Sequence, residues 1–155
     1  MHDIMWFAIH SGRCQEEITR LRREDLYRSR GTCLLRDVKH PTQKLGNHRV
    51  FRLLPTALSL LDTQPIADGD AGDVFFPYNP KSVGAAFTRA CEVLGIEDLH
   101  FHDLRHEATS RFFEAGYQIH EVPMFTLHES WATLKRYTNL RPQDVAARPL
   151  GESST

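Results

Sequence analysis

The fold can be read outward from one stretch, Leu99-His-Phe-His-Asp-Leu-Arg-His-Glu-Ala-Thr-Ser-Arg-Phe-Phe-Glu-Ala-Gly116. Apolar residues recur in it at helical spacing, at Leu104, Ala108, Phe112 and Ala115. Gly116 follows where a helix commonly ends in a left-handed residue. The pattern predicts a helix that begins near His102 and Asp103 and buries one face.

Two side chains near the start of this helix suit the binding of a phosphate group. His102 and Arg105 are three residues apart, so they project from the same side of a helix. Arginine grips two phosphate oxygens through its planar guanidinium, and histidine supplies or holds a proton. The helix N-terminus adds a favourable partial positive charge. The start of this helix is therefore a candidate phosphate site.

A second stretch makes the resemblance to a known family specific. His128 and Tyr137 stand nine residues apart in Leu127-His-Glu-Ser-Trp-Ala-Thr-Leu-Lys-Arg-Tyr-Thr-Asn-Leu-Arg141. The order His-x-x-Arg, then His, then Arg-Tyr-Thr-x-Leu resembles the catalytic domain of the tyrosine recombinases, or phage-type integrases. The resemblance covers nearly the whole chain, from Ile9 to Ala147. It implies a mixed α+β fold, mainly helical, with a small antiparallel β-sheet on one edge.

The resemblance also implies a role for each catalytic position. Tyr137 would be the nucleophile that attacks phosphorus and forms a 3′-phosphotyrosyl link. Arg105 and His128 would neutralise the charge on the phosphorane, and His102 would assist proton transfer around the tyrosine. Lys39 matches the family's general acid, which protonates the leaving 5′-oxygen. The link conserves bond energy for resealing, so we expect no nucleotide cofactor and no metal.

One position departs from the family. Its members usually read Thr-Gly-x-Arg-x-x-Glu-x-x-x-Leu where this chain has residues 11–21. Aligning Gly12 and Glu17 places Cys14 at the first catalytic arginine. Arg13 is adjacent, but one step along a helix rotates a side chain by about 100°. We therefore expect the chain to keep the fold and to cleave DNA poorly or not at all.

Local patterns predict the remaining elements. Helices are expected at 4–9, 15–21, 55–62, 80–95, 131–139 and 143–147, and strands at 32–38, 50–54 and 74–76. The first two strands would flank a long hairpin loop over 39–49 that carries Lys39. The core stripe of the 80–95 helix would be formed by Val83, Phe87, Cys91 and Leu94. The family usually has Leu-Gly-His where this chain has Thr126-Leu-His128, so we expect a less tightly bent turn there.

Charge is compatible with one electropositive face. The net charge is −1, but residues 1–55 carry eleven Lys and Arg against six Asp and Glu, and the rest carries eight against fourteen. A solvated surface explains this distribution about as well. The candidates for contact with DNA are Arg13, Lys44, His48, Arg49 and Arg136. The expected partners are double-stranded DNA and copies of the same chain in a tetramer on DNA, as the resemblance implies.

Length and composition limit the number of domains and the cellular setting of the chain. A chain of 155 residues with 41% hydrophobic content makes one domain the default, which we place at 1–150, with a frayed tail at 151–155. No apolar run of about eighteen residues predicts a membrane span, and scattered cysteines fit a reducing cytoplasm. The family normally adds an N-terminal helical domain that closes around DNA. We expect the sequence to be an excised catalytic domain or a truncated gene.

Other interpretations stay open. His102 and His106 stand four apart on the helix, as zinc ligands can, but no third ligand is placed. The acidic loop at 68–73 lacks the spacing and closing glutamate of a calcium loop. Type IB topoisomerases share the fold and chemistry. An inactive DNA-binding remnant is the alternative of a different class, and Cys14 favours it.

Overall fold

The computed structural model describes residues 1–39, 42, 45–138 and 141–151. Its α-helices are α1 (His2–Ser11), α2 (Gln15–Ile18), α3 (Pro55–Asp62), α4 (Pro80–Val93), α5 (Asp103–Glu114), α6 (Val122–Thr126) and α7 (Trp131–Lys135). Short 3₁₀ helices are η1 (Arg23–Asp25), η2 (Gly69–Asp73) and η3 (Pro142–Asp144). The strands are β1 (Leu26–Tyr27), β2 (Thr32–Leu35) and β3 (Arg49–Arg52). In these described ranges, no helix combines the length and apolar character that crossing a membrane requires.

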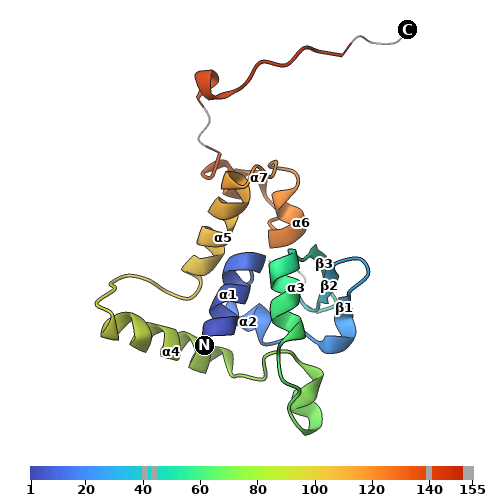
Figure 1. Ribbon diagram of the computed structural model, residues 1–155, viewed down its shortest axis with the longest axis vertical. Coiled ribbons are helices and arrows are strands. Elements are labelled where there is room, and N and C mark those ends of the chain that lie inside the picture. Colours follow the sequence, from blue (N-terminus) through green and yellow to red (C-terminus); the bar gives the residue numbers. More distant parts are fainter. Residues whose placement is uncertain (40–41, 43–44, 139–140, 152–155) are drawn as a thin grey trace.

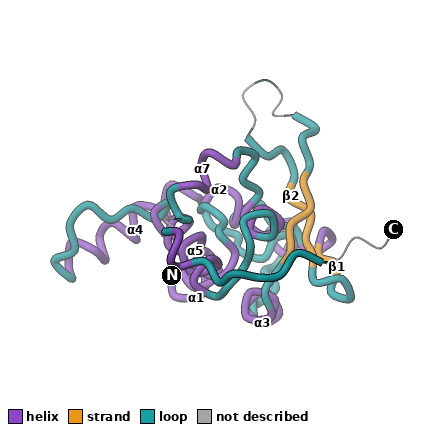
Figure 2. The backbone as a smooth tube through the Cα atoms, turned by 90° about the horizontal axis from the view of Figure 1, so that it is seen from above, coloured by secondary structure: helices purple, strands orange, loops and turns teal. Residues whose placement is uncertain are grey.

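The strands form one small antiparallel sheet in the order β1-β2-β3. The register of β2 and β3 runs from Thr32 opposite Arg52 to Leu35 opposite Arg49. The sheet lies at one edge of the molecule beside α3, and helices make up the rest of the body (Figure 1; Figure 2). The predicted mixed α+β class, mainly helical with a small sheet on one edge, is confirmed.

Helix α1 is the centre of the main core. It lies between α3 and α5 (Figure 1) and contacts both. Its buried residues are spaced by three and four, at Ile4, Phe7, Ala8 and Ser11. The ring of Phe7 packs 5.7 Å, centroid to centroid, from that of Phe76. This spacing gives α1 one wide apolar face, which its neighbours cover.

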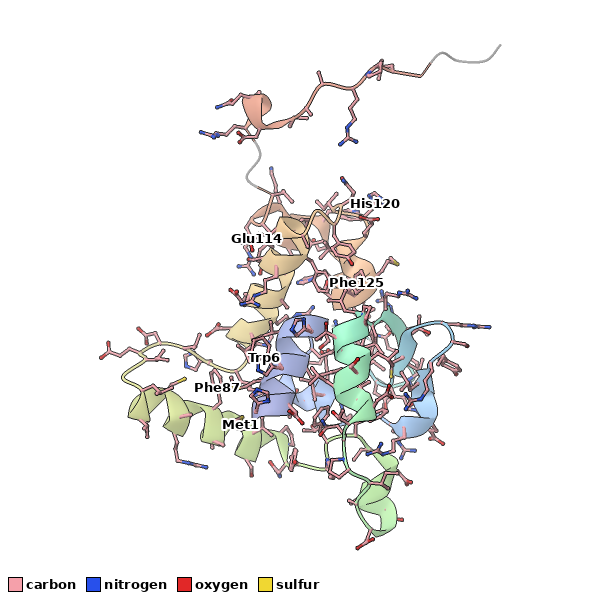
Figure 3. All side chains as sticks on the ribbon, in the orientation of Figure 1. Met1, Trp6, Phe87, Glu114, His120 and Phe125 are labelled. Carbon is pink, nitrogen blue, oxygen red and sulfur yellow. The ribbon has the colours of Figure 1, made fainter. Side chains whose placement is uncertain are left out.

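A second cluster joins α5, α6 and α7. Its buried members are Phe112, Val122, Phe125 and Leu134. The rings of Phe112 and Phe125 lie 4.6 Å apart, and Figure 3 marks Phe125 within this cluster. Because α6 and α7 flank the segment that carries His128, this cluster positions that segment against α5.

Two predictions near the sheet and at the C-terminus are wrong. The strand expected at 74–76 is reduced to a single bridge between Val74 and Arg22, since Phe75 and Phe76 turn into the core. The third strand is β1 instead. The helix expected at 143–147 is only the 3₁₀ turn η3. The described part of the C-terminal segment extends away from the helices (Figure 1), where no packing favours a longer helix.

The limits of several predicted helices also differ, and α2 ends at Ile18 rather than at residue 21. The helix expected over 131–139 ends at Lys135, so Tyr137 follows it. Helix α5 confirms the predicted start near Asp103, but Ala115 is its exposed C-terminal cap. Helix α4 ends at Val93, and its C-terminal end projects from the body (Figure 1; Figure 2). Leu94 is therefore 71% exposed and lies outside the core stripe to which it was assigned.

A matched pair of leucine substitutions checks this division between core and surface. Leu61 of α3 is 0% exposed, so Leu61→Ala should lower the free energy of unfolding by about 2–5 kcal/mol. Leu94→Ala should change it by less than about 0.5 kcal/mol. Urea denaturation followed by circular dichroism measures both. A loss of stability in Leu94→Ala comparable to that in Leu61→Ala would contradict the burial described here.

Candidate active site

Side chains from distant parts of the chain line one open pocket of about 410 Å³. The lining residues are Cys14, Gln15, Glu16, Glu17, Val38, Lys39, His102, Arg105, Thr126, Leu127, His128, Glu129, Ser130 and Thr133. They come from the start of α2, the segment after β2, the start of α5, and the stretch from the end of α6 into α7. Every catalytic position proposed from the sequence except Tyr137 is in this lining.

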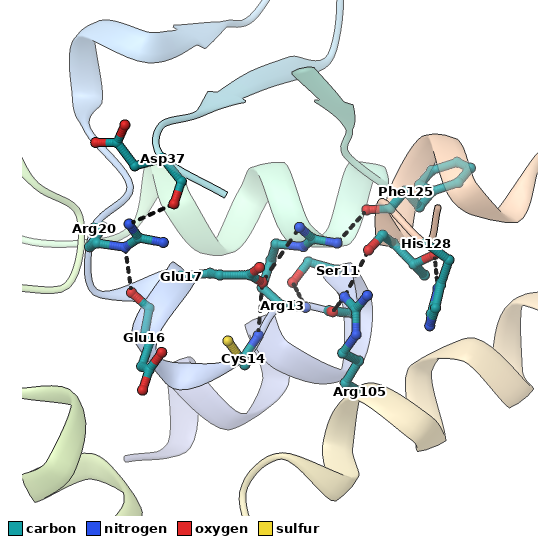
Figure 4. A network of polar contacts seen from close by, with 12 residues as sticks. Ser11, Arg13, Cys14, Glu16, Glu17, Arg20, Asp37, Arg105, Phe125 and His128 are labelled. Carbon is teal, nitrogen blue, oxygen red and sulfur yellow. Dashed lines mark hydrogen bonds and ion pairs between the residues drawn. The ribbon is translucent and has the colours of Figure 1, made fainter. Parts of the chain in front are cut away.

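Arg105, at the start of α5, connects the end of α1 with the end of α6. Its Nη1 donates to the carbonyl oxygen of Gly12 at 2.6 Å and to that of Thr126 at 2.7 Å (Figure 4). Gly12 closes α1 with φ 71°, a conformation that favours glycine, and a Cβ on it would lie 3.0 Å from Thr126 Cγ2. The glycine therefore allows the close approach that brings both carbonyls to the guanidinium.

Cys14 lies at the N-terminal cap of α2, half-buried against the pocket. Its backbone N–H donates to Glu17 Oε2 at 3.3 Å. Burial, together with the Glu17 carboxylate, raises the pKa of the thiol. The side chain is therefore a neutral thiol at pH 7, and it brings no positive charge to the pocket.

The side chain of Arg13 is turned inward, although the sequence made this residue a candidate for contact with DNA. Its side chain points away from that of Cys14 (Figure 4) and is 1% exposed. Nη2 donates to the Phe125 carbonyl at 3.2 Å, Nη1 lies 3.5 Å from Glu17 Oε2, and the guanidinium stands 4.9 Å over the Phe51 ring. Burial lowers the pKa of Arg13 to about 10, so it stays charged at pH 7. Successive residues face different directions, which turns this side chain inward.

Carboxylates outnumber fixed positive charges among the described lining residues. Lys39 and Arg105 are the cations, and Glu16, Glu17 and Glu129 are the acids. Lys39 Nζ pairs with Glu16 Oε2 at 3.0 Å, and this hydrogen bond raises the pKa of the lysine. Burial alone would raise the pKa of Glu17, but Arg13 and Arg105 more than offset it, so the net shift is downward. The glutamate remains ionised.

The turn before His128 is as tight as a glycine would make it, contrary to the prediction. Leu127 caps α6 in the left-handed conformation, with φ 59° and ψ 29°, and its N–H donates to the Pro123 carbonyl at 2.9 Å. This conformation costs a residue with a Cβ about 1–2 kcal/mol. The side chain of Leu127 is only 8% exposed and belongs to the main core. Burial of the leucine offsets the strain.

His128 is held as a neutral imidazole. Its Nδ1 lies 2.6 Å from Thr126 Oγ1, and that hydroxyl donates to the Val122 carbonyl at 3.2 Å. The Thr126 oxygen is then left to accept from Nδ1–H. Burial, with the nearby positive charges of Arg105 and Arg13, lowers the pKa of His128 to about 4.

Tyr137 lies outside the lining of this pocket, unlike the other residues that the resemblance makes catalytic. Its hydroxyl is 2.5 Å from His106 Nδ1, and its ring stacks 6.2 Å from that of Phe113. The sequence pattern relates His106 to His102 alone, as a zinc pair. The same spacing of four places His106 on the face of α5 that carries His102, which the resemblance puts near the tyrosine. Among the described residues, no group of three His, Cys, Asp or Glu side chains is arranged to hold a metal ion.

The candidates for contact with DNA among the other described residues, His48, Arg49 and Arg136, lie outside this pocket's lining. Arg49 Nη1 pairs with Glu129 Oε1 at 3.0 Å. His48 is exposed, and its Nδ1 accepts from the Asp37 N–H at 3.1 Å. The Arg136 guanidinium stands 5.2 Å over the Tyr137 ring. Lys44 falls outside the described residues.

Comparison with known proteins gives the family. A family model described as the phage integrase family matches residues 4–144. The chain belongs to the phage integrase family. The shufflon-specific DNA recombinase of Escherichia coli is 36% identical to it over 149 residues, which are 96% of this integrase chain and 37% of that relative. The chain therefore spans little more than a third of that relative's length.

Solved structures of integrases and recombinases share the fold. A Tn1549 transposon integrase in complex with circular intermediate DNA gives a TM-score of 0.71 at 15% identity, covering 92% of this chain and 56% of that one. XerA recombinase gives 0.63 at 16% identity, covering 92% and 59%. A lambda integrase dimer bound to a COC′ core site gives 0.66 at 17%, covering 96% and 55%. At these identities the likeness establishes the fold of the integrase chain.

The low pKa of His128 determines how the free energy of unfolding changes with pH. A histidine whose pKa falls from about 6.5 in the unfolded chain to about 4 in the fold binds its proton more readily when unfolded. The contribution of His128 to the free energy of unfolding is therefore fully present above about pH 6.5 and is lost as the pH falls toward 4. Imidazole NMR should give a midpoint near pH 4 for this residue.

The variant His128→Asn identifies the signal and serves as the control. It should also flatten part of the pH dependence of urea denaturation between pH 6.5 and 4. A His128 midpoint at or above pH 6.5 would show that the imidazole is not desolvated in solution as it is in this structure.

Proposed function

We propose that residues 1–150 are the catalytic domain of a site-specific DNA recombinase, followed by a tail at 151–155. The convergence of Lys39, His102, Arg105 and His128 on one pocket supports this proposal most directly. The likeness to a shufflon-specific DNA recombinase and to integrases bound to DNA adds to it. The substrate would be double-stranded DNA in the cytoplasm, and four copies of the chain would assemble on it, as the family resemblance implies.

The proposed reaction needs a nucleophile, a charge clamp and a proton donor. Tyr137 attacks phosphorus, with His102 assisting transfer of its proton, and forms a 3′-phosphotyrosyl bond as the bond to the 5′-oxygen breaks. Arg105 and His128 bind the non-bridging oxygens, and a bound phosphate would raise the pKa of His128 because an anion favours the imidazolium. Lys39 gives its proton to the leaving 5′-oxygen. For this it must leave Glu16, to which it is paired without DNA.

The same pocket supports a low activity for the chain as it stands. The phosphorane carries additional negative charge, and the described lining already holds three carboxylates against two fixed cations. The thiol of Cys14 neither adds a positive charge nor donates a bidentate hydrogen bond. Loss of one donor aimed at a transition state costs roughly 10²–10³ in rate in comparable enzymes. We therefore propose that Cys14 impairs strand cleavage.

A second candidate is a DNA-binding remnant that no longer cleaves. Cys14 and the carboxylates of the pocket favour it, since phosphate contacts elsewhere on the surface do not need the first arginine. The two candidates differ in one observable, the formation of a covalent link to DNA.

Covalent trapping on a nicked suicide substrate at low salt separates them. Cys14→Arg should raise the rate of trapping by about 10²–10³ over the unaltered chain, because it restores a charged, bidentate contact to the phosphorane. Adding Tyr137→Phe to Cys14→Arg should abolish trapping. Denaturing gel electrophoresis of labelled DNA measures the covalent product.

Two outcomes would contradict these assignments. Equal trapping by the unaltered chain and Cys14→Arg would mean that position 14 is not the first arginine position. Trapping that survives Tyr137→Phe would mean that another residue is the nucleophile.

DNA affinity should be weak and should fall steeply with salt, because phosphate contacts dominate it. Glu16→Gln should tighten binding several-fold, since it removes a carboxylate from the pocket and releases Lys39 for phosphate. Fluorescence anisotropy with a labelled duplex at several salt concentrations measures both effects.

Glu92→Gln is the matched control. It makes the same change of charge on α4, where Glu92 lines a different hollow. It should leave affinity nearly unchanged. Equal effects of the two variants would assign the gain to net charge, and an affinity that does not change with salt would exclude the electrostatic account.

A further inference from the structure

Tyr137 is held by contacts that belong to no part of the pocket. Its hydroxyl lies 2.5 Å from His106 Nδ1, and the two rings stack with centroids 6.3 Å apart. Arg136 also contacts His106, because its Nη2 lies 3.3 Å from the same Nδ1 atom. The side chains of His106 and Tyr137 are half-buried, and Tyr137 lines a groove beside the C-terminal half of α5. The contact is therefore a defined position of the tyrosine, distinct from the pocket.

The arginine fixes the protonation of His106. A guanidinium carries only donors, so the Nδ1 atom that Arg136 approaches must be an acceptor. Nδ1 is then unprotonated, and the hydroxyl of Tyr137 donates to it. The neutral imidazole would carry its proton on Nε2.

The surroundings of His106 favour this neutral form. Burial, followed by the positive charge of Arg136 and by His102, lowers its pKa below the ordinary value. Asp103 acts in the opposite direction but does not reverse the shift. The titratable or charged groups that act on this imidazole from α5, from the segment after α6 and from the residues after α7 are His102, Asp103, Arg105, His128, Arg136 and Tyr137.

We propose that His106 is a positioning residue that holds Tyr137 outside the pocket in the DNA-free protein. This rests on the proposed function, in which Tyr137 is the nucleophile. His102 lines the pocket one turn of α5 before His106, and the two imidazole rings are 5.7 Å apart, edge to face. To reach a phosphate in the pocket, the Tyr137 hydroxyl must break its hydrogen bond with His106 and move toward His102. The hydrogen bond stabilises the resting position and so opposes the first step of cleavage.

Two variants of His106 distinguish the effect of its hydrogen-bond acceptor from the effect of its stacking ring. His106→Asn keeps an acceptor near the position of Nδ1 without titrating, whereas His106→Phe keeps a stacking ring and removes the acceptor. In the chain labelled with ¹³Cζ-tyrosine, Tyr137→Phe assigns the signal of Tyr137. We expect that signal to shift in His106→Phe and to stay near its original position in His106→Asn. In the unaltered chain it should also move with pH in a window below 6.5, and in His106→Asn it should not.

The same pair is then compared by covalent trapping in the Cys14→Arg background. His106→Phe should speed trapping by roughly two- to tenfold, the range that a net hydrogen bond accounts for, and His106→Asn should leave it unchanged. Unchanged or slower trapping in His106→Phe, or equal acceleration in both variants, would overturn the proposal. So would a Tyr137 signal that ignores His106→Phe.

Failure of the proposed function gives a different result. If Cys14→Arg traps no DNA, or still traps it after Tyr137→Phe, the assignment of the nucleophile or of position 14 fails. The NMR comparison then decides by itself whether His106 holds Tyr137.

Discussion

The site depends on one guanidinium with two carbonyl acceptors. Arg105 donates to Gly12 and Thr126 through the same Nη1 atom, and so joins the end of α1, the start of α5 and the end of α6. Each of these ends is adjacent to a pocket residue. A charged donor that satisfies the carbonyls of two buried helix-end residues is a strong local constraint. Arg105 is thus the side chain that assembles the surface of the pocket around it, which couples folding of the site to the arrangement of its side chains.

The charge balance of the pocket follows from a neighbouring buried pair. Glu17 is fixed by the Arg13 guanidinium and by the Cys14 N–H, so its carboxylate stays ionised beside the pocket. In the family pattern this glutamate follows the first arginine by three residues, where it would balance a second positive charge. With Cys14 in that place, the carboxylate remains beside Arg13 and residue 14 supplies no second positive charge. Under the proposed function, Cys14 would therefore differ from arginine in charge as well as in hydrogen-bond donors.

The sequence correctly predicts the elements that follow from residue spacing. It does not predict side-chain positions that depend on contacts between residues far apart in the chain. Helix α5 and the β2–β3 hairpin follow from local periodicity and turn residues. The inward course of Arg13 depends on Phe51 and Phe125, which no local pattern connects to it. Tyr137 was expected with the other active residues because motifs give order along the chain, not the contact with His106. Leu94 continues the apolar spacing of Val83, Phe87 and Cys91, but it is exposed because the end of α4 no longer packs against the rest of the domain.

The left-handed leucine before His128 has a consequence for engineering this chain toward its family consensus. Glycine at position 127 would relieve a backbone strain of about 1–2 kcal/mol, but it would also remove an apolar side chain whose burial contributes about 1.5–3 kcal/mol. The two changes oppose each other, so the consensus residue offers no thermostability here. Selection for foldability alone would not restore the glycine, and a search that requires Leu-Gly-His would overlook sequences that keep the same turn by packing.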